Sequence, residues 1–155
     1  MAKSKVLLDS NCLINWLAKE VDEASGIALW KPSYQIALLA ENEEIDAYIA
    51  LTTLMEVRFV LRRKKRIPLN LVEKDIATLR ELFHTIVPDE LRILHAESLQ
   101  RDEPLGPFDA LLLSIALAIE DVIIITRDKQ FFSVARKYLP THTPESFLES
   151  ITGKK

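Results

Sequence analysis

A short run of β-branched residues near the end of the chain most constrains its fold. Residues 121–126 read Asp-Val-Ile-Ile-Ile-Thr, with no polar side chain among the aliphatic ones. A strand with one solvent-facing side alternates apolar and polar residues, whereas this run is apolar on both faces. It therefore predicts a central strand of a parallel sheet, with helices covering both sides.

Shorter strand patterns alternate with helical ones along the rest of the chain. Strands are predicted at residues 4–9, 46–51, 85–88 and, at an edge, 141–143. Helices are predicted at residues 11–20, from Pro32 onward, from 52 or 53 to 65, 69–84, 90–100, 108–120, after Asp128, and 144–150. The pattern over residues 21–44 is helical but interrupted, and no role is assigned to that segment. The alternation predicts an α/β sheet with every strand-to-helix loop at one edge, where such sheets bind ligands.

Length and composition fit one globular domain that spans residues 1–155. The chain is 48% hydrophobic and 28% charged, and its net charge is −3, so any attraction to nucleic acid must be local. Cys12 is the only cysteine, which excludes an internal disulfide and fits a cytoplasmic protein. The longest apolar stretch, residues 110–119, lies between two acidic residues and predicts a buried helix, not a membrane span.

Four carboxylates from distant parts of the chain are predicted to converge. Asp9 ends the first strand, and Asp128 follows the Ile-rich strand. Glu56 is predicted in the first turn of the helix after the second strand, and Asp109 in the first turn of the helix that leads into the Ile-rich strand. Because the carboxyl ends of parallel strands meet at one edge, all four are expected near one place.

Each carboxylate also has a purely structural interpretation. Asp9 and Asp128 suit helix N-caps, Thr53 and Glu56 have the spacing of a capping box, and Asp109 complements a helix dipole. Clustered like charges raise one another's pKa, so an ionised cluster needs a counter-charge. Oxygen ligands favour Mg²⁺ or Mn²⁺, and the three histidines lack the spacing of a zinc site.

Four short blocks follow one another in a characteristic order: Val-Leu-Leu-Asp-Ser-Asn-Cys-Leu-Ile at 6–14, Thr-Thr-Leu-Met-Glu-Val at 52–57, Phe-Asp-Ala-Leu-Leu-Leu-Ser-Ile-Ala at 108–116, and Ile-Thr-Arg-Asp-Lys-Gln-Phe at 125–131. No block is specific alone, but the ordered set resembles the PIN domain family and, within it, the VapC-type toxin ribonucleases. Residues 143–148 also resemble family C-termini. Cys12 stands where an aliphatic residue is usual, and residues 21–44 are long for the family; neither departure touches the acidic set.

The resemblance implies a three-layer α/β/α sandwich whose five-stranded parallel sheet has the order 3-2-1-4-5. It also implies an endoribonuclease that depends on Mg²⁺ or Mn²⁺ and hydrolyses phosphodiester bonds. Asp9 and Asp109 are then the expected primary metal ligands, Glu56 a ligand or general base, and Asp128 the completing ligand. Asn11 and Thr126 are expected to orient these carboxylates by hydrogen bonds.

The resemblance further implies a protein antitoxin and a homodimer. Trp16, Trp30 and Tyr34 are apolar candidates for the dimer interface. For the two tryptophans, packing in the core or at an interface is favoured over stacking on a base. For RNA contacts the candidates are Arg58, Arg62 and Arg63, in a basic run that also suits a solvated helix end, and Arg127, which also suits a surface ion pair.

Three other functions share parts of this pattern. A phosphoacceptor switch domain needs an acidic pair after the first strand and a lysine after the last; Asp9 is followed by Ser-Asn, and residues 141–143 contain no lysine. A catalytically silent binding scaffold has no use for four mutually repelling carboxylates. A nuclease of ribosomal RNA processing or decay keeps the same chemistry, and the sequence does not separate it from a toxin.

Overall fold

A five-stranded parallel sheet forms the centre of the molecule, in a computed structural model that describes residues 3–153. Its strands are β1 (Ser4–Leu8), β2 (Ile45–Ala50), β3 (His84–Ile86), β4 (Val122–Ile125) and β5 (Thr141–His142). They are arranged in the order β3-β2-β1-β4-β5, and every neighbouring pair is parallel. The predicted α/β class and strand order are confirmed.

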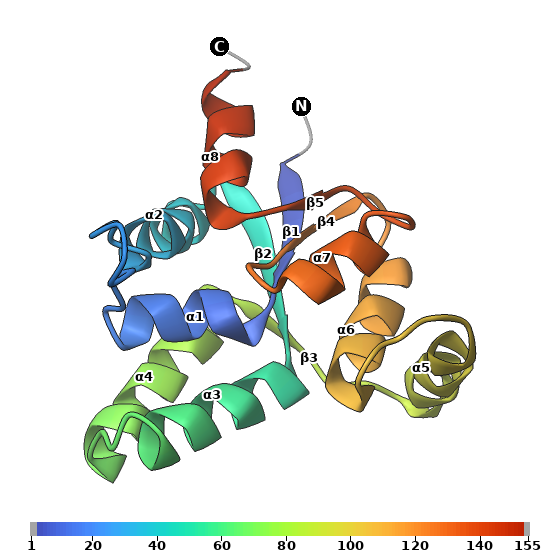
Figure 1. The fold of residues 1–155 in the computed structure, drawn as a ribbon, viewed down its shortest axis with the longest axis horizontal. Helices are drawn as coiled ribbons and strands as arrows, with labels where there is room; N and C mark the ends of the chain where they lie inside the picture. Colours follow the sequence, from blue (N-terminus) through green and yellow to red (C-terminus); the bar gives the residue numbers. More distant parts are fainter. Residues whose placement is uncertain (1–2, 154–155) are drawn as a thin grey trace.

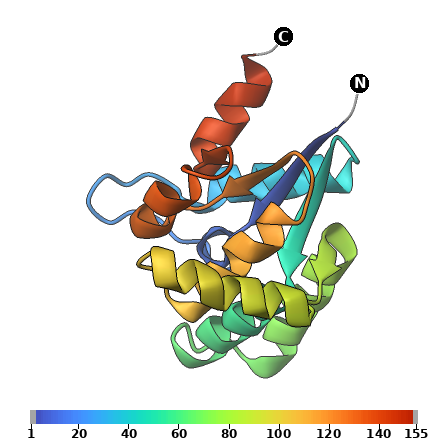
Figure 2. The same ribbon diagram turned by 90° about the vertical axis from the view of Figure 1, so that its right-hand side faces the viewer.

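Helices cover both faces of this sheet. One face carries α1 (Ser10–Leu17), α2 (Trp30–Glu41), α3 (Leu51–Arg63), α4 (Leu69–Leu82) and α8 (Pro144–Thr152); the other carries α5 (Glu90–Asp102), α6 (Pro107–Leu117) and α7 (Lys129–Ala135). The two groups lie on either side of β1 in Figure 1, and Figure 2 views the molecule from the side of α5.

Strand β1 shows why the sheet must be covered twice. Val6 and Leu8 pack into the core under α1 to α4, while Leu7 points into the core under α5 to α7. All three side chains are almost completely buried. A strand that alternates between two apolar cores has no solvent-facing side, as the apolar run of β4 also predicts.

The carboxyl ends of the central strands are held in a fixed register. Leu8 lies opposite Ile125, and the N–H of Asp9 donates a hydrogen bond of 3.0 Å to the carbonyl of Ile125. The N–H of Thr126 donates in turn to the carbonyl of His142, at 2.9 Å. The ladder therefore continues past both strands and fixes Asp9 beside Thr126.

The start of α3 differs from the prediction. The helix begins at Leu51, its N-cap is Ala50, and no side chain caps it. The capping-box interpretation of Thr53 and Glu56 is therefore wrong, and Glu56 lies in the second turn instead of the first. Thr53 is instead buried.

Residues 21–29 are not helical, in contrast to the pattern expected there. An isolated antiparallel bridge joins Val21 to Ala28, and Gly26 takes a positive φ of 75° in the turn between them. Helix α2 starts at Trp30, two residues before Pro32. Proline is tolerated there because N–H groups in a first helical turn have no partner within the helix.

The apolar stretch at residues 110–119 is a helix that is largely buried as far as Ala116, as predicted. It forms most of α6, in which Leu113, Ile115 and Ala116 are at most 1% exposed. Within residues 3–153, no helix combines the length and apolar character that crossing a membrane requires.

Candidate active site

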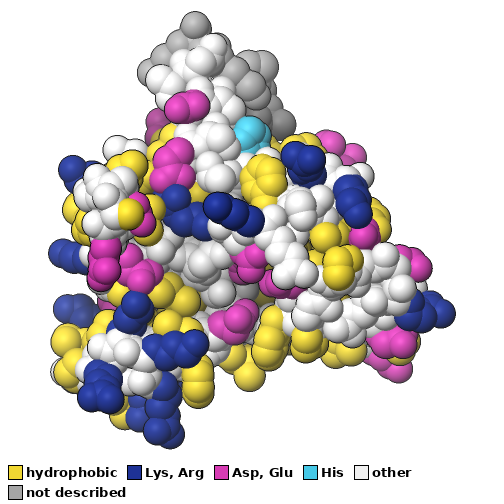
Figure 3. All heavy atoms as spheres, in the orientation of Figure 1, with side chains coloured by type: hydrophobic (Ala, Val, Ile, Leu, Met, Phe, Trp, Pro, Cys, Tyr) yellow, Lys and Arg dark blue, Asp and Glu magenta, His cyan; other side chains and the backbone are white. Residues whose placement is uncertain are grey.

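The four predicted carboxylates line one cleft of about 370 Å³ at the carboxyl edge of the sheet. Asp9 lies between β1 and α1, Glu56 on α3, Asp109 on α6 and Asp128 between β4 and α7. Figure 3 shows acidic side chains gathered near the middle of this face, with basic ones around them. The fold thus unites groups from four distant segments.

Asp9 is the most buried of the four carboxylates, with 6% of the residue exposed. Its Oδ1 accepts a hydrogen bond from the backbone N–H of Ser10 at 2.8 Å, and it caps α1. Its Oδ2 accepts from the hydroxyl of Thr126 at 2.8 Å and from the amide of Asn11 at 3.4 Å. The carboxylate is therefore held in one orientation, and its capping role coexists with its place in the cleft.

Thr126 links Asp9 to the opposite wall of the cleft. Its fully buried hydroxyl also accepts a hydrogen bond of 3.0 Å from the backbone N–H of Asp128. Asp128 caps α7 through a 3.0 Å hydrogen bond from the N–H of Phe131. The hydrogen bonds expected of Asn11 and Thr126 are present, and the N-cap interpretation of Asp128 holds together with its place in the cleft.

The carboxylates form one electrostatic unit. Burial, and then the charges of Asp9, Asp128 and Glu56, raise the pKa of Asp109 to about 7. Burial also raises the pKa of Glu56, with a further contribution from Asp9. The pKa of Asp9 is also raised, and burial is the main cause. The hydrogen bonds from Thr126 and Ser10 oppose that shift. Repulsion of this kind is relieved by a cation.

The donor chemistry of the cleft fits a hard divalent cation. Carboxylate oxygens from four side chains line it, and no histidine or cysteine does. Within the described part of the chain, no three His, Cys, Asp or Glu side chains already form a metal-binding group. The residues therefore fit Mg²⁺ or Mn²⁺ by their chemistry and charge, without a ready-made coordination shell.

The family model described as PIN domain matches residues 6–137, which include all four carboxylates and every strand but β5. The chain belongs to the PIN domain family. No curated protein gave a significant match.

This PIN domain has the fold of several solved structures at low sequence identity. A toxin–antitoxin complex from Klebsiella pneumoniae is 20% identical, with a TM-score of 0.63 and coverage of 90% of this chain and 97% of that one. VapBC2 from Rickettsia felis, bound to a DNA fragment from its promoter, is 17% identical, with a TM-score of 0.65 and coverage of 89% and 98%. A protein from Pyrobaculum aerophilum is 14% identical, with a TM-score of 0.64 and coverage of 97% and 90%.

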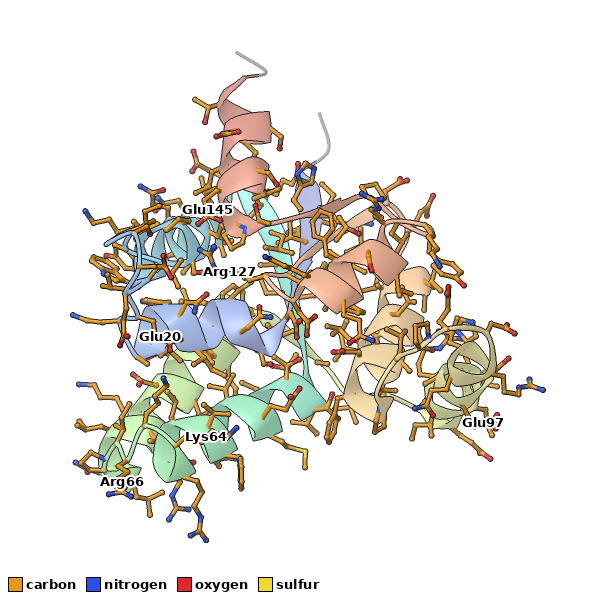
Figure 4. All side chains as sticks on the ribbon, in the orientation of Figure 1. Glu20, Lys64, Arg66, Glu97, Arg127 and Glu145 are labelled. Atoms are coloured by element: carbon orange, nitrogen blue, oxygen red, sulfur yellow. The ribbon has the colours of Figure 1, made fainter. Side chains whose placement is uncertain are left out.

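Arg127 is held by three separate parts of the PIN domain. Its guanidinium donates to the side chain of Asn15 at 2.7 Å and to the carbonyl of Leu29 at 3.0 Å, and it pairs with Glu145 at 2.6 Å. Figure 4 shows Arg127 and Glu145 close together beside α1. The ion pair that the sequence allowed is formed, so this side chain connects α1, α8 and the segment before α2.

The other candidate arginines lie on α3. Arg58 forms an ion pair with Glu73 of α4 at 2.8 Å, and both side chains are more than a third exposed. Arg62 and Arg63 are exposed, and together with Met55 and Phe59 they line a shallow groove beside Arg58. The basic run therefore borders the helix that carries Glu56.

The aromatic candidates pack mainly on one another. Trp16 is partly buried against the core, and its ring lies 6.1 Å from that of Tyr34. The ring of Trp30 lies 6.3 Å from the same tyrosine. Core packing, one of the interpretations of the tryptophans, is the one observed for Trp16.

The sequence did not assign to the site the three residues before Asp109, which are the N-cap and the first two residues of α6. Gly106, Pro107 and Phe108 line the cleft, and Phe108 is 49% exposed at its rim. The signal was their position next to Asp109, where Gly-Pro marks the start of a helix. Ser10 also lines the cleft, directly after Asp9.

Proposed function

We propose that this PIN domain is an endoribonuclease that depends on Mg²⁺ or Mn²⁺ and hydrolyses RNA phosphodiester bonds. One observation carries the proposal: carboxylates from four distant segments share one cleft, in which burial and then their mutual charges raise the pKa of Asp109. Such repulsion costs folding free energy, so a structural role does not account for the cluster. Membership of a family of generally metal-dependent nucleases supports the same function.

Each cleft residue has a distinct role in this proposal. Asp9 and Asp109 hold the cation, and Asp128 completes its ligands. A bound divalent cation supplies the positive charge that an anionic phosphodiester needs and lowers the pKa of water. Glu56 holds the cation with them or acts as general base; burial and then the charge of Asp9 raise its pKa, so it accepts a proton more readily than an exposed glutamate does. Thr126 and Asn11 keep Asp9 oriented.

The reaction is an in-line hydrolysis. The oxygen of a water molecule forms a bond to phosphorus, and Glu56 takes the proton in its general-base role. The bond from phosphorus to the ribose 3′-oxygen breaks, and that oxygen becomes a hydroxyl by taking a proton from solvent, to which Glu56 returns the proton it accepted. The products carry a 5′-phosphate and a 3′-hydroxyl.

We further propose that the chain is the toxin of a type II toxin–antitoxin pair and acts in the cytoplasm. Two of the structures that share its fold are toxin–antitoxin complexes. A protein antitoxin would inhibit it by covering the acidic cleft. Expression of the chain in cells tests this role. A toxin should arrest growth, and the product of a small adjacent gene should relieve the arrest. Harmless expression would instead favour RNA processing or decay.

The activity is tested by cleavage of a labelled single-stranded RNA. We expect cleavage with Mg²⁺ or Mn²⁺, none with EDTA, and none with Asp9→Asn, which removes a charge at constant shape. Glu97→Gln, an exposed change on α5, is the matched control and should cleave as the parent does (Figure 4). Equal cleavage by all variants, or in EDTA, would identify a contaminating nuclease and refute the proposal.

A further inference from the structure

A second groove lies directly beside the acidic cleft. It has a volume of about 350 Å³ and runs along α7 to the junction of β5 and α8. Thr126 and Arg127 form the end nearest the cleft, and Thr143 lines the side of α8. Since Asp128 belongs to the cleft and Lys129 to the groove, the two hollows share one wall.

One face of α7 forms the long wall of this groove. Lys129, Phe132, Ser133 and Arg136 are spaced as i, i+3, i+4 and i+7, which places them on one side of a helix. The opposite side is buried in the core through Phe131, Val134 and Ala135. The groove side therefore presents two cations and an aromatic ring that the core does not require.

No negative charge opposes these cations. No carboxylate lines the groove, and neither Lys129 nor Arg136 forms an ion pair with any carboxylate of residues 3–153. Arg127 is already neutralised by Glu145. The net charge of the protein is −3, so the attraction of these two cations for an anion is local to this groove.

Helix α3, on the other side of the cleft, also carries a stripe with two cations and an aromatic ring, although one of its cations, Arg58, is paired with Glu73. The residues that line its groove with the same helical spacing are Met55, Arg58, Phe59 and Arg62. This stripe begins next to Glu56, as the α7 stripe begins next to Asp128. The two helices belong to opposite layers, and the amino-terminal end of α1 lies between them (Figure 1).

We propose that the α7 groove binds the nucleotides on one side of the scissile bond of an RNA strand that crosses the acidic cleft. This proposal rests on the proposed nuclease function. Lys129 and Arg136 would contact backbone phosphates, and Phe132 would contact the face of a base. Cations that follow the backbone, together with an aromatic ring, are how proteins bind single strands, whereas a duplex keeps its base faces stacked.

The test measures the binding of a fluorescent single-stranded RNA dodecamer by anisotropy, in EDTA, over a range of salt concentrations. Lys129→Glu/Arg136→Glu should weaken binding and lower the slope of log K against log salt by about 1.4, as expected for two lost phosphate contacts. Phe132→Leu should weaken binding about tenfold and leave that slope unchanged, because it keeps an apolar side chain but removes the ring. Lys74→Glu/Arg80→Glu on α4 makes the same charge change outside both grooves and should behave as the parent.

The outcomes separate this proposal from the nuclease itself. If the α7 and α4 double variants weaken binding equally, the attraction is general and the groove proposal is wrong. If the parent cleaves RNA and the α7 variants bind it normally, the groove proposal fails while the nuclease stands. If the α7 variants lose binding as expected but no divalent cation supports cleavage, the nuclease fails and the groove stands.

The same cations would also attract an acidic protein segment. Suppose that the parent binds polyglutamate, and that Lys129→Glu/Arg136→Glu abolishes this binding but leaves RNA binding unchanged. The occupant of the groove would then be a protein, and the proposal would be overturned. The proposal is supported if unlabelled RNA displaces the fluorescent RNA and polyglutamate at an equal concentration of charge does not.

Discussion

The hydroxyl of Thr126 donates a 2.8 Å hydrogen bond to Oδ2 of Asp9, although the two residues are 117 positions apart in the sequence. The same hydroxyl oxygen accepts the backbone N–H of Asp128. One buried side chain thus fixes the orientation of one cleft carboxylate and the backbone position of another. The parallel pairing of β1 with β4 makes this possible, because it aligns the residues that follow the two strands.

Thr126→Val is expected to impair both the fold and the site. The change keeps the shape of the side chain but leaves Oδ2 of Asp9 with only the longer hydrogen bond from Asn11, and it removes the partner of the Asp128 N–H. The free energy of unfolding should fall by about 1–3 kcal/mol, measured in urea. RNA cleavage should fall by about 10- to 100-fold, as is usual when a group that orients a metal ligand is lost.

Thr126→Ser is the control for that experiment, since it retains the hydroxyl. Its cleavage rate should stay within a few-fold of the parent's, even if the lost methyl group lowers stability. If Thr126→Val cleaves RNA as fast as Thr126→Ser, the hydrogen bond to Asp9 has no part in positioning the site.

Asp109→Asn is expected to stabilise the metal-free protein while abolishing cleavage. The ordinary pKa of this carboxyl is 3.8, and in the folded protein it is about 7, because of burial and the charges of Asp9, Asp128 and Glu56. The folded state therefore binds the proton more tightly, so the contribution of Asp109 to stability falls as the pH rises from about 4 to about 7. Asparagine has no such charge to bury.

The expected gain in EDTA at pH 8 is about 1–2 kcal/mol, after a discount for solvent screening of a half-buried group. This corresponds to a rise of about 2–8 °C in Tm for a chain of this size. The gain should shrink as the pH is lowered toward 4, and Glu97→Gln, which changes an exposed carboxyl, should give no comparable gain. A variant less stable than the parent at pH 8 would show that Asp109 is not repelled by its neighbours.

Local patterns were sufficient to predict the sheet and the acidic set. The apolar run of β4 and the abrupt end of β1 at Asp9 each follow from a few adjacent residues, and parallel topology then places their ends together. The start of α3 was not predictable in this way. Thr52 and Thr53 looked like N-caps, yet tertiary packing buries Thr53 and starts the helix earlier without any side-chain cap.

Contacts between distant segments account for what the sequence could not supply. Arg127 follows the end of β4, and nothing in its neighbourhood in the sequence indicates that Asn15, Leu29 and Glu145 surround it. The stripe on α7 was overlooked for another reason. Its helical spacing is visible in the sequence, but only the fold shows that it borders the acidic cleft.

Arg127→Gln is expected to destabilise the fold more than Arg58→Gln does. The side chain of Arg127 is only 18% exposed and joins three segments, so its loss should cost about 1–3 kcal/mol. Arg58 pairs with Glu73 at the surface, where ion pairs contribute little, and its loss should cost no more than about 0.5 kcal/mol. Urea unfolding of both variants measures the difference in their free energies of unfolding. Glu145→Gln, alone and combined with Arg127→Gln, completes a double-mutant cycle for the ion pair. An unchanged stability together with weakened RNA binding would assign the Arg127 guanidinium to the substrate instead.

A homodimer is the final prediction, and the structure changes which residues are its candidates. The aromatic side chains of Trp16, Trp30 and Tyr34 contact one another. A group of more strongly exposed apolar side chains lies elsewhere. Val87 is 69% exposed, and at the start of α5 Leu91 is 66% exposed and Leu94 is 58% exposed.

Leu91 and Leu94 are one helical turn apart, so they lie on the same side of α5, the helix that faces the viewer in Figure 2. Exposed apolar patches of this kind commonly mark protein interfaces. We therefore expect a dimer at micromolar concentration in analytical ultracentrifugation and a monomer for Leu91→Glu/Leu94→Glu. Val21→Glu/Ile27→Glu alters two exposed apolar residues in the segment before α2 and should remain dimeric. A parent protein that sediments only as a monomer, or a dimer that survives the α5 change and is lost with the control pair, would contradict this interface.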